Sequence, residues 1–508
     1  MRRFLKKTIR LLSSRLLWFA LLMASQFIII ILAAFYFSND VHVLFLLLAM
    51  SFCAVLFVAT REESPDYKLS WMLIICVFPL AGGILYLIFG KKKIGKIASR
   101  KILQTRDLGH YDIEDITREE LEGIDESEAR QMSYIYQTSG YAPAKNTSVR
   151  YFAFGDDFFN DLINEIEKAE KFIFIEYFIL APGKVWDTIL EILRRKSREG
   201  VLIRILYDDL GSINVLPAGY AQKLRAMGFE AYTFNPLALH MNPRLNYRDH
   251  RKIFNIDGNV CYSGGLNLAD EYTNDIIRFA YWKDNAMKIS GQAVWNFTMM
   301  FLLVWKAITK KEEDFSLFRP SVSVPSDGYV QPFADSPFDE RAIARNVYLQ
   351  AINNARQYVW MVSPYLILDS EITTALSIAA ASGVDVRIVT PHYADKKSVH
   401  EVTRSVYKRL VSQGVRIYEF TPGFIHSKTL VADDKIALVG TANLDYRSFY
   451  LHFELSVLFA GGTVIKSVKD DTIYALERSD EQTMEKVVKV SFFRRLVRTF
   501  FGFFATAL

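Results

Sequence analysis

The second half of this chain repeats the first, and the repeat restricts the possible folds more than any other feature of the sequence. Apolar runs rich in β-branched and aromatic residues, typical of buried strands, recur in the same order in both halves. The matching segments are 171–180 with 358–367, 200–206 with 383–389, and 228–236 with 414–422. Helical stretches separate the runs. This alternation predicts an α/β fold of two domains, each with a largely parallel sheet flanked by helices.

Each half also carries one copy of the pattern H-x-K-x-x-x-x-D. The copies are His250, Lys252 and Asp257 in the first half and His426, Lys428 and Asp433 in the second. Because side chains alternate along a strand, the His and the Lys of one copy lie on the same face and can reach one phosphate. We therefore expect the six residues to form a catalytic site. For each Asp, five residues beyond its Lys, a role in holding a turn is an equal alternative.

An asparagine follows each copy at the end of a second short strand. Asn267 ends the segment Gly-Gly-Leu-Asn, and Asn443 ends the segment Gly-Thr-Ala-Asn. An amide at this place can donate a hydrogen bond to a phosphoryl oxygen beside the Lys. The sequence thus predicts that two His, two Lys and two Asn surround one phosphorus atom.

These side chains suit a two-step displacement at phosphorus. One imidazole attacks in line, while the other protonates the leaving alkoxide and later deprotonates the incoming alcohol. The lysines offset the charge on the equatorial oxygens, so we expect no metal and no cofactor. A nucleophilic imidazole needs a carboxylate or a carbonyl on its other nitrogen. Asp284 and Glu454, at similar distances after their motifs, are the candidates for this support, unless they are surface carboxylates.

Residues 1–94 are expected to attach the chain to a membrane. Three apolar runs, 16–37, 41–60 and 69–89, have about the 20 residues that a helix needs to cross a bilayer. Basic residues precede the first run and follow the third. Three spans would place these two clusters on opposite sides, although basic residues favour the cytoplasm, so the number of spans stays open. We expect a multi-pass membrane protein whose globular part faces the cytoplasm.

The rest of the chain divides into four segments. They are a charged connector at 95–144, a first domain at 145–318, a second domain at 319–490, and a basic aromatic tail at 491–508. The tail combines six Phe with three Arg. It would lie in a membrane interface with Arg494, Arg495 and Arg498 on lipid phosphates, or it would close the core of the second domain.

Two shorter segments also have an expected place. The first half has extra residues before His250, including 237–243, which we expect to line one side of the site entrance. The apolar segment 297–307 is too short to cross a bilayer. It is expected to pack between the two halves or to lie on the bilayer.

Charge and cysteine content limit the partners. The formal net charge is +5, and basic residues gather beside the apolar runs, which indicates an anionic lipid surface rather than nucleic acid. The three cysteines have no paired spacing, so the sequence indicates neither a disulfide framework nor a zinc site.

These motifs resemble those of the phospholipase D superfamily, and the surrounding sequence narrows the resemblance to the bacterial cardiolipin synthases. The similar segments are 78–90, 246–252, 264–272, 281–284 and 440–448. The resemblance implies two phospholipase D-like domains in a bacterial cell membrane protein. It also implies a phosphatidyltransferase that joins two phosphatidylglycerol molecules into cardiolipin and releases glycerol. In the superfamily the first-motif histidine is the usual nucleophile, which implies a phosphohistidine at His250 and an acid and base role for His426.

Other functions stay open at this point. A membrane-anchored phospholipase D hydrolase, or a phosphatidyltransferase that uses another alcohol, would have the same site, because only the acceptor differs. A nuclease, which the superfamily also contains, is disfavoured by the apolar runs and the modest net charge. An inactive scaffold is disfavoured because both motifs are intact. The sequence does not indicate the acyl preference or the oligomeric state.

Overall fold

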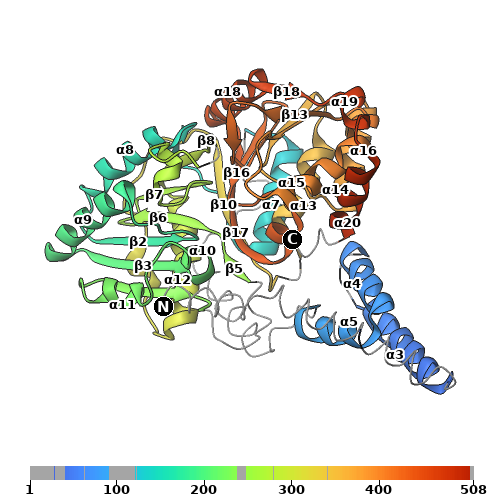
Figure 1. Cartoon of the computed structure of the whole chain (residues 1–508). Helices are drawn as coiled ribbons and strands as arrows, with labels where there is room; N and C mark the ends of the chain where they lie inside the picture. The colour runs from blue at the N-terminus through green and yellow to red at the C-terminus, as the bar shows by residue number, and fades with distance from the viewer. Residues whose placement is uncertain are drawn as a thin grey trace. The chain divides into compact units, whose positions relative to one another are not determined.

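A computed structural model of the 508-residue chain describes residues 28, 41–61, 63, 65–90, 121, 123–236, 247–278, 280–339 and 341–503. These residues fall into an N-terminal unit, with the helices of residues 41–90, and a main unit, with both halves of the repeat (Figure 1). The first apolar run, apart from Ile28, and the insertion at 237–243 lie outside the described residues.

The N-terminal unit consists of short helices around a small apolar centre. They are α3 (Val41–Ala59), α4 (Pro65–Val77), α5 (Pro79–Leu85) and a π-helical turn, η1 (Tyr86–Gly90). Val58, Ile75 and Tyr86 are buried against one another. The run 69–89, expected as one span, is instead divided between α4 and α5, because Pro79 cannot continue the helical hydrogen bonding. No helix in the described residues is both long enough and apolar enough to cross a membrane.

The first domain is built on a mixed sheet in the order β1-β9-β7-β6-β2-β3-β4. Its strands are β1 (Thr147–Phe152), β2 (Phe172–Tyr177), β3 (Leu202–Asp208), β4 (Glu230–Phe234), β6 (Lys252–Ile256), β7 (Val260–Gly264) and β9 (Ala286–Gly291), with the short β5 (Arg248–Asp249) and β8 (Tyr281–Lys283) outside this sheet. Its helices are α8 (Gly155–Ile166), α9 (Lys184–Arg198), α10 (Asp209–Ser212), α11 (Tyr220–Arg225), η5 (Asp270–Thr273), α12 (Val294–Thr309) and η6 (Phe315–Phe318).

The second domain repeats this plan in the order β10-β17-β16-β15-β11-β12-β13-β18. Its strands are β10 (Tyr329–Asp335), β11 (Tyr358–Val362), β12 (Asp385–Pro391), β13 (Arg416–Phe420), β14 (Gly423–Ile425), β15 (Thr429–Ala432), β16 (Ile436–Gly440), β17 (His452–Ala460) and β18 (Ser479–Glu481). Its helices are α13 (Ile343–Asn354), α14 (Ser370–Ala381), α15 (Lys397–Ser405), α16 (Tyr407–Ser412), α17 (Tyr446–Tyr450), α18 (Val464–Glu477), α19 (Met484–Val488) and α20 (Phe492–Phe503).

The duplicated α/β plan is confirmed, but the expectation of largely parallel sheets is wrong. Strands joined through helices do run parallel, as in β2–β3–β4 and β11–β12–β13. The strands that carry or follow the motifs, β6 and β7 in the first domain and β15 and β16 in the second, pair antiparallel. A tight turn joins each of these pairs and reverses the chain, which gives two mixed sheets.

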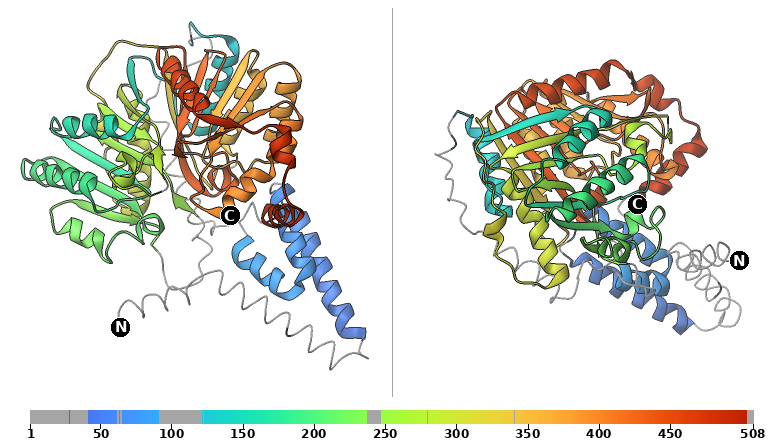
Figure 2. Two further views of the ribbon diagram at one scale, coloured as in Figure 1. Left: turned by 45° about the horizontal axis from the view of Figure 1, so that its top comes forward. Right: turned by 90° about the vertical axis from the view of Figure 1, so that its left-hand side faces the viewer.

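The two domains share an apolar core. Phe297 and Met300 of α12 are buried in one cluster with Val464 and Val468 of α18 and with strands of both sheets. The segment 297–307 therefore packs between the halves at its N-terminal end, one of its two expected places. Helices α8 and α9 cover the side of the first sheet away from the second domain (Figure 2). The inner faces of the two sheets therefore pack together in the shared core.

Part of the charged connector belongs to the second domain. The segment forms α7 (Glu126–Ser139), whose Met132 and Ile135 are buried with Phe333 and Val347 of the second domain. An isolated bridge also joins Ala144 to β10. The chain therefore runs from the second domain's core into the first domain, which ties the two domains together before the repeat begins.

Asp257 and Asp433 lie in matching turns, both with positive φ. The Asp257 carboxylate accepts hydrogen bonds from the backbone N–H groups of residues 170, 171 and 172 at 2.7–2.8 Å. Asp433 accepts from those of residues 356, 357 and 358 at 2.6–2.9 Å. Because each Asp stands five residues beyond its Lys on an extended strand, it lies about 16 Å from it. These contacts favour the turn-holding alternative over the catalytic role.

Replacing Asp257 by Ala should therefore destabilise the fold. The substitution leaves three backbone N–H groups without their acceptor, so we expect the free energy of unfolding to fall by about 2–4 kcal/mol. Chemical denaturation followed by circular dichroism measures this change. Asn146→Ala is the matched control, because Asn146 also has a positive φ and is exposed. If the Asp257→Ala protein is stable but inactive, Asp257 has a catalytic role instead.

Candidate active site

Two short parallel strand pairs cross from one domain to the other and set the register of the site. β5 pairs with β17, and β8 pairs with β14. The backbone N–H of His250 continues the first pair by donating to Phe453 O at 2.9 Å. That of His426 continues the second by donating to Lys283 O at 2.7 Å. The next position in each register therefore brings His250 to Glu454 within β17 and His426 to Asp284 after β8.

His250 is held by a carboxylate of the second domain. Its Nδ1 lies 3.1 and 3.0 Å from Oε1 and Oε2 of Glu454, and both side chains are buried. Glu454 is also fixed by the hydroxyl of Thr441, which donates to Oε2 at 2.5 Å. With the proton on Nδ1 directed at Glu454, the lone pair of the His250 Nε2 is available to attack phosphorus.

His426 is held in the same way by the first domain. Its Nδ1 lies 2.7 Å from Oδ2 of Asp284, and both side chains are buried. The other oxygen of Asp284 accepts from the backbone N–H of Asn285 at 2.9 Å. A Cβ on Gly265 would come within 2.0 Å of Asp284 Oδ1, so the Gly-Gly-Leu-Asn segment leaves the space that the carboxylate needs. Both predicted carboxylates thus support an imidazole, each in the opposite domain.

The two motif lysines are buried beside the imidazoles. Lys252 Nζ donates to the backbone oxygen of its own motif histidine at 2.6 Å. Lys428 Nζ lies 2.8 Å from Nδ1 of His426. Burial and the positive charge of Lys428 lower the pKa of Lys252 to about 7, although the Glu454 carboxylate acts in the opposite direction. Burial likewise lowers the pKa of Lys428 to about 8. An anion between the two ammonium groups would relieve this penalty.

Both imidazoles are neutral near pH 7. Burial lowers the pKa of His250 to about 3, although the Glu454 carboxylate acts in the opposite direction. Burial and the Lys428 ammonium lower the pKa of His426 to about 4, against the effect of Asp284. Each can therefore act as a nucleophile or a base in the free protein. A bound phosphate anion would raise both pKa values, which is what an acid role requires.

The two asparagines have different surroundings. The side-chain oxygen of Asn267 accepts from the backbone N–H of Ile179 at 3.2 Å, and its amide nitrogen lies 2.5 Å from the hydroxyl of Tyr272. Asn267 thus holds the loop after β2. The Oδ1 atom of Asn443 is buried and has no hydrogen-bond partner in the described residues. Of the two, Asn443 is the better candidate for contact with a substrate.

Two residues of this site escaped the sequence analysis, Thr441 and His452. Thr441 stands in the motif Gly-Thr-Ala-Asn, two residues before Asn443, and a hydroxyl at this place was the only signal for it. His452 Nδ1 lies 3.5 Å from Glu454 Oε1, and the rings of His452 and His250 are 5.7 Å apart between centroids. The spacing of His452 from Glu454 was its only signal in the sequence.

The site offers possible ligands for a metal ion, but its positive charge would repel one. His250, His452 and Glu454 each offer a ligand atom, and these atoms lie within 4.8 Å of one another. However, Glu454 already accepts the Nδ1 hydrogen bond, and it is also the carboxylate that attracts the charge of Lys252. The lysines make the site attractive to an anion and repel a cation.

Comparison with known proteins places this arrangement in a family. The model described as "Cardiolipin synthase, PLD-like domain" matches residues 162–288 and 348–472, and the model "Phospholipase_D-nuclease N-terminal" matches residues 46–91. A cardiolipin synthase of Halalkalibacterium halodurans is 32% identical over 88% of this chain and 89% of its own length. An uncharacterized protein of Streptococcus mutans is 39% identical over 87% of this chain and 97% of its own.

A solved structure supports the fold. The crystal structure of phosphatidylserine synthase from Haemophilus influenzae matches with a TM-score of 0.57 and 13% identity, over 74% of this chain and 98% of that one. At this identity the match speaks for the fold alone. The family model over both halves, the cardiolipin synthase relative at 32% identity and the paired H-x-K motifs together assign the chain. It belongs to the cardiolipin synthase family of phospholipase D-like phosphatidyltransferases.

Proposed function

We propose that the chain transfers a phosphatidyl group from one phosphatidylglycerol molecule to the headgroup hydroxyl of a second, which gives cardiolipin and glycerol. The single observation that carries this proposal is the crossed support of two buried imidazoles, His250 by Glu454 and His426 by Asp284. Two lysines beside them favour a phosphate between the two rings. Membership of the cardiolipin synthase family supports the choice of lipid.

In the proposed first step, His250 Nε2 attacks phosphorus and the bond from phosphorus to the glycerol oxygen breaks. His426, protonated in the complex with the anionic lipid, gives its proton to the leaving oxygen. In the second step, the hydroxyl of another phosphatidylglycerol loses its proton to His426 and attacks phosphorus, and the bond from phosphorus to His250 breaks. Lys252 and Lys428 stabilise the charge on the phosphoryl oxygens in both steps.

The phosphohistidine should map to His250. Each of His250→Ala and His426→Ala should lower cardiolipin synthesis at least about 1,000-fold, because each step needs both imidazoles. With an activated phosphatidyl donor, whose leaving group needs no acid, alkaline quenching and mass spectrometry should find the adduct at position 250 in the His426→Ala protein and none in the His250→Ala protein. His392→Ala is the matched control, because its imidazole binds Glu419. An adduct at position 426 in the His250→Ala protein would reverse the two roles.

Transfer should outcompete hydrolysis, because the reacting side chains are buried and the second lipid supplies the hydroxyl. Excess glycerol should therefore drive the reaction backwards and convert labelled cardiolipin to phosphatidylglycerol. Thin-layer chromatography of the lipids measures both products. If phosphatidic acid is the main product and glycerol has no effect, the chain is a phospholipase D hydrolase instead.

Activity should fall at alkaline pH because the two motif lysines lose their positive charge. Their lowered pKa values, about 7 for Lys252 and about 8 for Lys428, mean that the charged forms are lost as pH rises through this range. We expect kcat/KM to fall about tenfold between pH 7 and 8 and about a hundredfold for each pH unit above 8, because both ammonium groups are then lost and the free protein binds phosphate poorly. A bound phosphate raises both pKa values, so the fall in kcat should begin at higher pH. A fall of kcat and kcat/KM at the same pH would contradict this.

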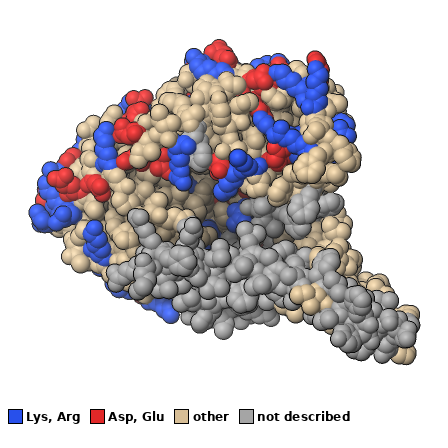
Figure 3. Space-filling model, in the orientation of Figure 1, with Lys and Arg blue, Asp and Glu red and all other residues tan. Residues whose placement is uncertain are grey.

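We also propose that the N-terminal unit attaches the chain to the bacterial cell membrane, with the site on the cytoplasmic side. Phe45, Leu46 and Phe52 of α3 are exposed in this unit, which supports contact with lipid. Nucleic acid is a less suitable partner. On the face drawn in Figure 3, Lys and Arg are interspersed with Asp and Glu, whereas a nuclease needs a basic track for phosphates.

A further inference from the structure

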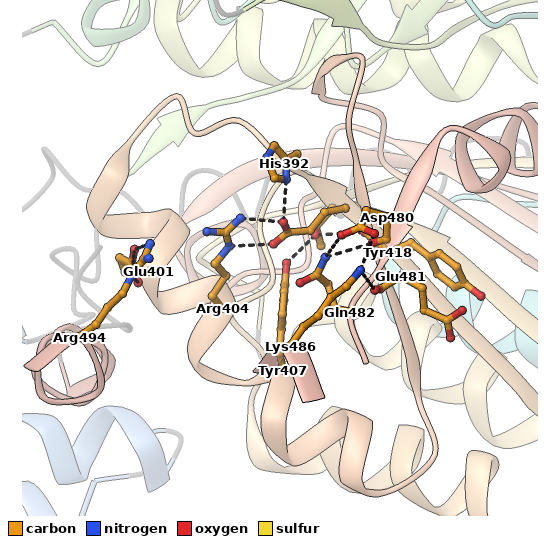
Figure 4. Close-up of polar contacts among 12 residues, drawn as sticks. His392, Glu401, Arg404, Tyr407, Tyr418, Asp480, Glu481, Gln482, Lys486 and Arg494 are labelled. Atoms are coloured by element: carbon orange, nitrogen blue, oxygen red, sulfur yellow. Dashed lines mark hydrogen bonds and ion pairs between the residues drawn. The ribbon is translucent and has the colours of Figure 1, made fainter. Parts of the chain in front are cut away.

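The C-terminal helix α20 is bound to α15 through its basic side. Arg494 Nε lies 3.0 Å from Glu401 Oε1, and Arg498 Nε lies 2.8 Å from Glu401 Oε2. Figure 4 shows Arg494 reaching from α20 to Glu401. Although burial opposes it, these two guanidinium groups lower the pKa of Glu401 to about 2, so the ion pairs persist across the physiological range. These ion pairs direct Arg494 and Arg498 at Glu401, whereas the sequence analysis expected them on lipid phosphates.

An aromatic contact fixes the same side of α20. Phe501 packs against a small cluster formed by Ile367, Val399 and Val402, with Tyr365 at its edge. Successive helical residues are separated by about 100°, so Arg494, Arg498 and Phe501 share one face of α20. This face packs against the second domain, so the opposite face of α20 points outward.

The outward face of α20 is apolar. Phe492 and Phe493 are each 75% exposed, and Leu496 is 51% exposed. Val488 and Met484 of the preceding α19 are also exposed, at 43% and 38%. The alternative that this segment closes the domain core does not fit, because the side chains that would fill a core point away from it. Exposed Phe and Leu side chains on one face of α20 indicate a contact surface.

The helix that holds α20 also borders the active site. Asp395 lies two residues before the start of α15. Its Oδ2 accepts a hydrogen bond from the hydroxyl of Tyr365 at 2.5 Å, and its negative charge supports the ammonium form of Lys428. Lys396 Nζ lies 5.7 Å from the ring centroid of Tyr365, and Lys396 is exposed. Helix α15 thus connects the aromatic face of α20 to a basic rim beside the phosphate site. Lys396 forms this rim.

We propose that α20 docks the main unit on an anionic phospholipid surface, with Phe492, Phe493 and Leu496 in the interface. An exposed Phe and Leu face suits the boundary between headgroups and acyl chains. Arg495 of α20 and Lys396 of the rim are exposed cations that complement anionic headgroups. The choice of lipid as occupant rests on the proposed function, since a site that consumes bilayer lipids must meet their headgroups.

Fluorescence quenching in the full chain tests this contact without any need for turnover. A fluorophore is attached at Phe493→Cys after Cys53 and Cys76, which are exposed, are changed to Ala; Cys261 is buried and stays. The protein is placed in nanodiscs that contain phosphatidylglycerol and a lipid with a nitroxide on its acyl chain. Leu317→Cys is the matched control, because Leu317 is 72% exposed on η6 of the first domain.

We expect the label at position 493 to lose most of its emission to the nitroxide lipid and the label at position 317 to lose little. Equal emission at the two positions would overturn the proposal. Self-quenching of the label at 493 that increases with protein concentration, without nitroxide, would assign the patch to a second copy of the chain and also overturn it.

A second variant links the contact to catalysis. Phe492→Ser, Phe493→Ser and Leu496→Ser together should raise the mole fraction of phosphatidylglycerol needed for half-maximal rate about tenfold and leave kcat within about twofold. Because these side chains are exposed, the melting temperature should not change, and Leu317→Ser should alter neither value. An unchanged requirement for lipid in a folded triple variant would refute the docking role. Quenching at 493 in a protein that makes no cardiolipin would refute the proposed function alone.

Discussion

The whole site depends on one exchange, in which each motif imidazole is held by a carboxylate from the opposite domain. Glu454 binds His250, and Asp284 binds His426. Neither domain contains a complete pair of imidazole and carboxylate. A single copy of the repeat therefore cannot fix the tautomer of its own histidine, and the domains must dock before either half can react. The shared apolar core between α12 and α18 supplies the energy for this docking.

The exchange also balances buried charge. Two ammonium groups, Lys252 and Lys428, are buried with two carboxylates, Glu454 and Asp284. Isolated charges at this depth would cost several kcal/mol each, whereas neighbours of opposite sign offset much of that cost. The lowered lysine pKa values mean that the balance is incomplete in the free protein. A phosphodiester anion completes it, so binding a lipid phosphate stabilises the charged lysines that the reaction needs.

Much of this could be predicted from the sequence, for identifiable reasons. A period of two on one strand places His250 and Lys252 together, and the repeat does the same for His426 and Lys428. The sheet direction could not be predicted, because buried strands read as apolar runs whether they pair parallel or antiparallel. The sequence also could not predict that Glu454 and Asp284 each support the histidine of the opposite domain. The strand β5 is only two residues long, and its pairing with β17 exists only in the docked domains.

The same limit explains the C-terminal segment. A pattern of Phe and Arg indicates that apolar surface must be covered, but it does not indicate whether lipid or protein covers it. Whether the arginines of α20 face lipid or protein depends on Glu401, which stands 93 residues before Arg494. Once Glu401 binds Arg494 and Arg498, helical geometry turns Phe492 and Phe493 outward. The direction of the aromatic face is therefore decided by a distant ion pair, and local amphipathicity alone cannot reveal it.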